Sequence, residues 1–82
     1  MIFVYEAVNM TLKERFVGIG MMPLEVITKE HQSSPPGCAQ HWDFANHKVV
    51  YHDLMQTYEQ ADADYFIQDY KQMTPMPGWR MI

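Results

Sequence analysis

Four residues that can bind metal ions lie close together in the middle of the chain: Cys38, His41, His47 and His52. Thiolate and imidazole are ligands that zinc prefers, and Cys38 and His41 are separated by only two residues, close enough to share an ion. The longer gap between His41 and His47 matches no common zinc spacing, and a single thiolate makes a structural site weak. The spacing therefore favours surface histidines on loops, with His52 and Asp53 forming a polar strand end.

A second group of chemically interesting residues is acidic: Glu59, Asp62, Asp64 and Asp69. Carboxylates spaced along a helix can imitate the phosphates of a nucleic acid, as they do in DNA-mimicking inhibitors. They can equally form the solvated face of an amphipathic helix. The sequence leaves both interpretations open.

Large aromatic residues form a third group, made up of Trp42, Phe44, Tyr51 and Trp79. If they are exposed together, they could form a platform on which bases or other flat groups stack, and Trp42, Phe44 and Trp79 are then the binding residues. A small domain also needs large aromatic side chains inside, and core packing is the interpretation that we favour.

Two alternating apolar runs near the start of the chain must position any such site. Residues 2–9 and 14–20 predict two strands, joined by a turn over 9–13 into an antiparallel hairpin. The first run is apolar on most of both faces, which is typical of a strand that is covered on both sides. Gly18 and Gly20 allow the backbone to bend or to approach another group closely.

The following residues predict a helix, a loop and a third strand. Pro23 suits the first position of a helix that runs to about His31, and prolines and a glycine make 33–37 a loop. Val49, Val50 and Tyr51 indicate a strand over 48–53.

The last part of the chain predicts a second helix and an extended tail. Thr57 and Gln60 have the spacing of a capping box, an apolar stripe follows, and Pro75 ends the helix. The tail is apolar, and we expect Trp79 to pack on the core. The prediction is an α+β fold in the order β-β-α-β-α, a small three-stranded antiparallel sheet flanked by helices, with residues 1–82 as a single domain.

Composition narrows the choice of partner. The 82 residues carry a formal net charge of −4, which disfavours nucleic acid because its binding depends on neutralising phosphates. Eight methionines suit an irregular core or an adaptable protein-binding surface. No apolar run approaches the ~20 residues of a membrane span, and the first residues lack the basic region of a secretion signal, so we expect a cytoplasmic location. Cys38 is the only cysteine, which rules out an intramolecular disulfide.

The blocks Phe3-Val4-Tyr5 and Phe16-Val17-Gly18 resemble the paired signature of the GIY-YIG nuclease domain. Two later blocks, Phe66-Ile67-Gln68-Asp69-Tyr70 and Pro77-Gly78-Trp79-Arg80, resemble the last core helix and the closing block of that family. The order of elements is also similar, so the resemblance covers nearly the whole chain.

The resemblance implies metal-assisted phosphodiester hydrolysis, with Mg or Mn as the cofactor, and each role can be followed to a residue. Tyr5 matches the first catalytic tyrosine, but the second falls on Phe16, which has no hydroxyl. The family's arginine falls near Val26 or Ile27, with Lys29 one turn away as an imperfect substitute. The metal-binding glutamate falls on Ala63, and the closing asparagine falls on Arg80.

The sequence therefore predicts a catalytically inactive GIY-YIG-like pseudo-nuclease that acts as a binding module, with a protein as its partner. One alternative is a divergent divalent-metal nuclease that uses Tyr5, Lys29 and Asp62 or Asp64. Another is an acidic, DNA-mimicking inhibitor of a nucleic-acid enzyme.

Overall fold

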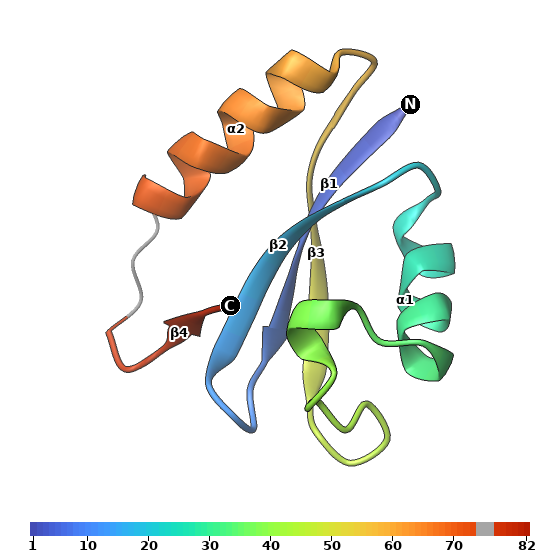
Figure 1. The fold of residues 1–82 in the computed structure, drawn as a ribbon, viewed down its shortest axis with the longest axis vertical. Coiled ribbons are helices and arrows are strands. Elements are labelled where there is room, and N and C mark those ends of the chain that lie inside the picture. Colours follow the sequence, from blue (N-terminus) through green and yellow to red (C-terminus); the bar gives the residue numbers. More distant parts are fainter. Residues whose placement is uncertain (74–76) are drawn as a thin grey trace.

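A computed structural model describes residues 1–73 and 77–82 and shows a single sheet with helices on both faces (Figure 1). In chain order the elements are β1 (Ile2–Asn9), β2 (Glu14–Gly20), α1 (Leu24–Ser33), the 3-10 turn η1 (Gly37–Ala39), β3 (Val49–Thr57), α2 (Gln60–Met73) and β4 (Arg80–Met81).

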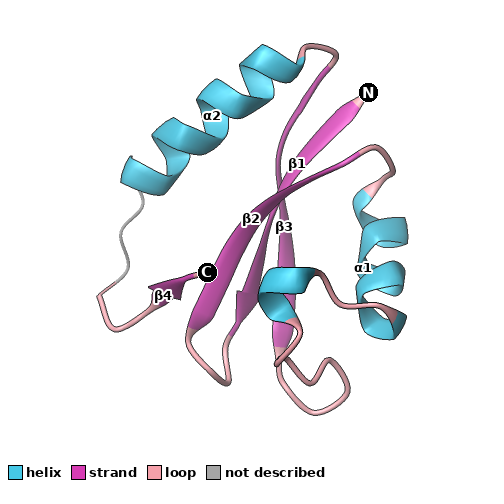
Figure 2. Ribbon diagram, viewed as in Figure 1, coloured by secondary structure: helices cyan, strands magenta, loops and turns pink. Residues whose placement is uncertain are grey.

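The sheet has four strands in the order β3-β1-β2-β4, so the long strand β1 lies in its interior (Figure 2). β1 pairs antiparallel with both β2 and β3, whereas β4 pairs parallel with β2 at Glu14 and Arg15. The α+β class is confirmed, but the prediction of three antiparallel strands is wrong. The short fourth strand makes the sheet mixed, and a strand of two residues has no alternation by which a sequence could reveal it.

The two helices cover opposite faces of the sheet, and successive residues of β1 contact one helix layer or the other because they point in opposite directions. Tyr5 and Ala7 belong to an apolar cluster with Ile27 of α1, and Val4 belongs to another with Ala63 of α2. All of β1 except Phe3 is buried, as predicted for a strand that is covered on both sides.

The predicted hairpin is confirmed with the predicted bounds, 2–9 and 14–20. β3 begins one residue later than predicted and continues to Thr57 instead of ending at Asp53. The register between β1 and β3 shifts directly after Asp53. Tyr5 pairs with Asp53, whereas its neighbour Val4 pairs with Met55. Leu54 is the extra residue of a β-bulge, which breaks the alternation that would have predicted the rest of the strand.

The helices begin close to the predicted positions. α1 starts at Leu24 with Pro23 as its N-cap, and its buried residues are Ile27 and His31. At the start of α2 the predicted capping box does not form. Instead, the Thr57 hydroxyl accepts from the amide of Glu59, and the Gln60 side chain donates to Asp64. Pro75, the predicted end of this helix, lies outside the described residues.

The C-terminal segment lies along the outer edge of β2. The amide of Arg80 donates to the carbonyl of Lys13, and the amide of Ile82 donates to that of Arg15. Ile82 packs against the apolar cluster on the α1 face, while Trp79, expected to pack on the core, is half-buried. In the part of the chain that the structure describes, no helix is both long and apolar enough to cross a membrane.

Candidate functional site

The buried centre of the α1 face holds Tyr5 from β1, His31 from α1 and Tyr51 from β3, which we call the tyrosine–histidine cluster. The Tyr5 hydroxyl lies 3.4 Å from Nε2 of His31, and the Tyr51 hydroxyl lies 2.8 Å from Nδ1 of the same ring. A neutral imidazole has one donor and one acceptor nitrogen, so one tyrosine accepts a hydrogen bond and the other donates one.

Burial widens the pH range over which this cluster is electrically neutral. It raises the pKa of Tyr5 to about 12, with a smaller contribution from a charge on Cys38, and it also raises the pKa of Tyr51. The same loss of water lowers the pKa of His31 below its usual value of 6.5. The charged form of each group is disfavoured in this apolar environment. A phenol in this state is a poor general base at neutral pH.

Two residues of β2 enclose the Tyr5 ring. The ring of Phe16 meets it edge to face, with centroids 6.1 Å apart, and Gly18 is its partner in the β1–β2 ladder. A Cβ atom at Gly18 would lie 2.6 Å from the Tyr5 hydroxyl oxygen, so the glycine allows the ring to lie against the backbone. This is the close approach that the sequence predicts at Gly18. Tyr5 is only 4% exposed as a result.

The other residues implied by the nuclease resemblance do not gather around Tyr5. Lys29 is exposed on α1, two residues from both Ile27 and His31, the buried residues of that helix, and therefore points away from the sheet. Ala63 is buried with Ile2 and Val4 on the opposite face.

The three remaining candidates of this set lie in other environments. Asp62 and Asp64 are exposed on α2, the helix that covers the face opposite Tyr5. Arg80 lies on β4 and binds Glu14. Tyr5, Lys29 and an aspartate therefore do not form one open cleft.

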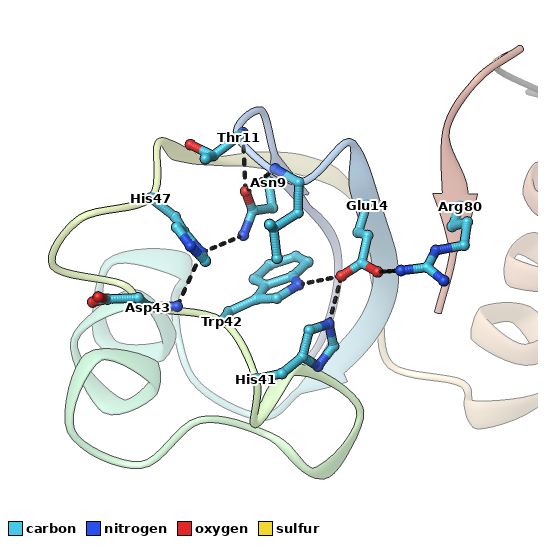
Figure 3. Close-up of polar contacts among 9 residues, drawn as sticks. Asn9, Thr11, Glu14, His41, Trp42, Asp43, His47 and Arg80 are labelled. Carbon is cyan, nitrogen blue, oxygen red and sulfur yellow. Dashed lines mark hydrogen bonds and ion pairs between the residues drawn. The ribbon is translucent and has the colours of Figure 1, made fainter.

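A second polar site surrounds Glu14, the first residue of β2, which is 1% exposed (Figure 3). Its Oε1 accepts hydrogen bonds from Nε2 of His41 at 2.5 Å and from Nε1 of Trp42 at 2.9 Å. Its Oε2 accepts from the guanidinium of Arg80. We call Glu14, His41, Trp42 and Arg80 the Glu14 cluster.

These donors keep Glu14 ionised. Hydrogen bonds from His41 and Trp42, with a further contribution from Arg80, lower its pKa from 4.5 to about 2 although burial opposes the change. Both carboxylate oxygens are occupied, so the group is well placed to hold three segments together and badly placed to transfer a proton. The segments are the start of β2, the loop after η1 and strand β4.

Asn9 ties the hairpin turn to the loop that precedes β3 (Figure 3). Its side-chain oxygen accepts from the amides of Thr11 and Leu12, and its side-chain nitrogen lies 3.1 Å from Nδ1 of His47. The amide of Asp43 also donates to this Nδ1, at 3.0 Å. Nδ1 is therefore an acceptor, and the neutral His47 ring carries its proton on Nε2.

The four candidate metal ligands have separate environments. Cys38 is exposed on η1, His41 binds Glu14, and His47 binds Asn9. His52 is exposed on β3, where it pairs with Glu6 across the ladder. Within residues 1–73 and 77–82, no group of three or more His, Cys, Asp or Glu residues is arranged to hold a metal ion.

The candidate stacking residues are not exposed together. Trp42 is 4% exposed, and its ring packs against those of Phe16 and Phe44, with centroids 5.3 and 5.8 Å apart. Phe44 and Trp79 are half-buried. Phe44 also lines an open hollow of about 300 Å³ with Gln32 and Ala45.

Sequence reasoning missed the buried charged residues, which are among the best-connected groups of the fold. Glu6 accepts from Arg15 at 2.8 Å and from the hydroxyl of Tyr70 at 3.0 Å on the α2 face. Glu14 plays the corresponding role at the turn of the hairpin. The signal was present, since a charged residue inside a strand that is covered on both faces must be paired within the protein.

Comparisons with known protein families, with curated proteins and with solved structures found no match to this chain.

Proposed function

We propose that this chain is a catalytically inactive, GIY-YIG-like interaction module whose partner is a protein. The observation that carries the proposal is the state of Tyr5, the tyrosine of the paired signature that the chain keeps. Its hydroxyl is buried, lies within hydrogen-bonding distance of His31 and has a pKa raised to about 12. A catalytic hydroxyl has to reach water and substrate and to give up its proton, and this environment opposes both.

The polar interior also supports a binding role. Among the described residues, no buried side-chain nitrogen or oxygen lacks a hydrogen-bond partner. Active sites are where buried polar groups commonly remain unpaired or strained, because they await a substrate. Among the described residues, complete pairing leaves no buried polar side-chain atom waiting for a substrate.

The surface that we assign to the partner is an apolar patch at one end of the sheet. The end of β1 that carries Met1 lies beside the ends of β2 and β3, because Phe3 pairs with Gly20 and Ile2 pairs with Thr57 (Figure 1). Five exposed apolar residues lie at or just beyond these strand ends, and we call them the methionine patch: Met1, Ile19, Met21, Met22 and Tyr58.

The methionine patch is suited to a protein partner. Met21 and Tyr58 are 68% and 78% exposed, which is costly for large apolar side chains unless another surface covers them. Flexible thioether side chains adapt their shape to a partner. The net charge of −4 on the whole chain favours a protein over a nucleic acid as the partner.

The catalytic half of the proposal is tested with purified protein, Mg²⁺ or Mn²⁺, and single-stranded, duplex and branched DNA. We expect no cleavage of any of these substrates. Cleavage that disappears in a Tyr5→Phe variant would establish the alternative, a divergent nuclease. Cleavage that survives in Tyr5→Phe would indicate a contaminating enzyme.

The binding half is tested by affinity capture with two variants of equal charge change. Met21→Lys alters the patch, whereas Met73→Lys alters an equally exposed methionine at the end of α2. We expect one reproducible protein with the wild type and with Met73→Lys, and its loss with Met21→Lys. Capture of no reproducible protein, or equal capture by both variants, contradicts the assignment.

A second function, an acidic inhibitor of a nucleic-acid enzyme, is favoured by exposed carboxylates on α2 and on the residue before it. Glu59, Asp62, Asp64 and Asp69 are all exposed, and within residues 1–73 and 77–82 none of them forms an ion pair. If this function holds, the captured partner is a nucleic-acid enzyme. Duplex DNA should then displace this enzyme from the chain, and Asp62→Asn should weaken its binding. A partner that stays bound when duplex DNA is added argues against mimicry.

A further inference from the structure

β3 is an edge strand with an accessible outer side. It pairs with β1 on one side, and none of its nine residues is buried, in contrast to its neighbour β1. An edge strand presents backbone N–H and C=O groups that can pair with another strand, and proteins usually protect such edges with prolines, lysines or bulges. The stretch Val49–Asp53 contains neither proline nor lysine.

The ladder with β1 determines which backbone groups point outward. The amide of Met10 donates to the carbonyl of Lys48, which makes these two residues a hydrogen-bonded pair. Hydrogen-bonded pairs alternate along an antiparallel ladder, so Val50 and His52 also direct their N–H and C=O groups toward β1. The groups of Val49, Tyr51 and Asp53 therefore point away from the sheet.

The bulge at Leu54 limits the regular part of the edge. The register with β1 is continuous from Val49 to Asp53 and shifts beyond it. The bulge thus leaves a five-residue segment, Val49-Val50-Tyr51-His52-Asp53, with evenly alternating outward groups.

We propose that this segment pairs antiparallel with the same segment of a second copy of the chain, centred on Tyr51, to join the two sheets into one. In this register Val49 faces Asp53 of the second copy, and Tyr51 faces its own equivalent. Each such pair exchanges two hydrogen bonds, about six in all, which satisfies every outward group of the segment.

The side chains favour this register over its neighbours. Residues directly opposite each other lie on the same face, and Val49 and Tyr51 already share the α1 face of the sheet. A register centred on His52 or Asp53 would place two identical imidazoles or carboxylates opposite each other. A register centred on Val50 would place Asp53 opposite His47, which lies outside the strand.

Two substitutions at Asp53 separate backbone pairing from side-chain effects. Asp53→Ala and Asp53→Pro both remove the carboxylate, but only proline removes the outward N–H, and the ladder to β1 does not use that group. Sedimentation equilibrium from about 1 to about 500 μM gives the dimer dissociation constant of each protein. We expect dimers for the wild type and Asp53→Ala, and at least a tenfold weaker dimer for Asp53→Pro, with unchanged circular dichroism.

The proposal is overturned if the wild type stays monomeric over this range, or if both Asp53 variants dimerise equally well. An isotope-filtered NMR experiment on a mixture of labelled and unlabelled wild-type protein covers the case in which Asp53→Pro does not fold. It should show contacts between the two Tyr51 residues and between Val49 and Asp53 of different copies. A dimer that lacks these contacts uses another surface and contradicts the proposal. Neither result depends on the nuclease or capture experiments.

Discussion

Replacing Glu14 with glutamine removes the charge of a buried carboxylate while preserving its size. Glutamine can still accept a hydrogen bond from Trp42 through its carbonyl oxygen, but its amide has no charge to offer Arg80 or His41. The substitution therefore measures what the ionised state of Glu14 contributes to the attachment of β4 and of the loop after η1.

The expected size of the effect follows from the pKa. A fall in the pKa of Glu14 from 4.5 to about 2 corresponds to roughly 3 kcal/mol of stabilisation at neutral pH. The side chains of His41 and Arg80 are 52% and 78% exposed, so water screens both partners and reduces this figure. We expect Glu14→Gln to lower the free energy of unfolding by ~1–2 kcal/mol at pH 7.

The pH dependence gives the prediction its direction. The carboxyl has a lower pKa in the folded than in the unfolded protein, so on acidification the unfolded chain takes up the proton first. The stabilisation is complete above pH 4.5 or slightly higher and is lost as pH falls toward about 2. Glutamine does not titrate, so the difference in free energy of unfolding between wild type and variant should shrink as the pH falls through this window.

Urea unfolding at about pH 7, 4 and 3, followed by circular dichroism, measures this difference if the slope with denaturant is unchanged. Asp69→Asn is the matched control, because it removes one carboxylate charge from the exposed face of α2 and should change stability little. A Glu14→Gln effect that is as large at pH 3 as at pH 7 would refute the role of charge. So would an effect no larger than that of the control.

Three further outcomes follow from the tyrosine–histidine cluster and the Glu14 cluster. Gly18→Ala should destabilise the fold by ~1–3 kcal/mol in urea unfolding, because its Cβ would clash with the Tyr5 hydroxyl. Gly37→Ala, whose Cβ meets no atom within 4 Å, should change stability little. The NMR titration midpoint of His31 should lie below 6.5, and the stability advantage of the wild type over His31→Gln should decrease as pH falls through 6.5, because the unfolded chain binds the proton more readily. Arg80→Gln should cost less than ~1 kcal/mol, because the Arg80 side chain is 78% exposed; a larger loss would show that β4 is held mainly by this ion pair.

The parts of the fold that the sequence predicts well are those whose pattern is local. The bounds of β1 and β2 follow from alternation interrupted by turn residues, and α1 follows from Pro23 and an apolar stripe. β3 was predicted too short because the bulge at Leu54 breaks its alternation. β4 could not be predicted, because a two-residue parallel pairing depends on contacts across more than sixty positions of the chain.

In the candidate site too, contacts between residues that are near in sequence are easier to predict than contacts between distant elements. Tyr5 and Phe16 both lie on the predicted hairpin, and in the structure their rings meet edge to face. Whether Lys29 and Ala63 would join them depended on which face of the sheet each helix covers and on which side of each helix is buried. That depends on long-range packing, and the structure places Ala63 on the other face.

The two buried carboxylates explain how so small a domain orders its C-terminal half. Glu6 binds Tyr70 of α2 on one face, and Glu14 binds Arg80 of β4 at the start of β2. Both acids lie on the hairpin, so an element built from local contacts also binds elements that are far away in sequence. A buried charge stabilises weakly when it is paired, but it strongly penalises an arrangement in which all of its partners are missing. Loss of Arg80 alone costs less, because His41 and Trp42 still donate to Glu14. The hairpin thus selects one arrangement of the later elements, and the tyrosine that resembles a catalytic group serves the same end by packing between the sheet and α1.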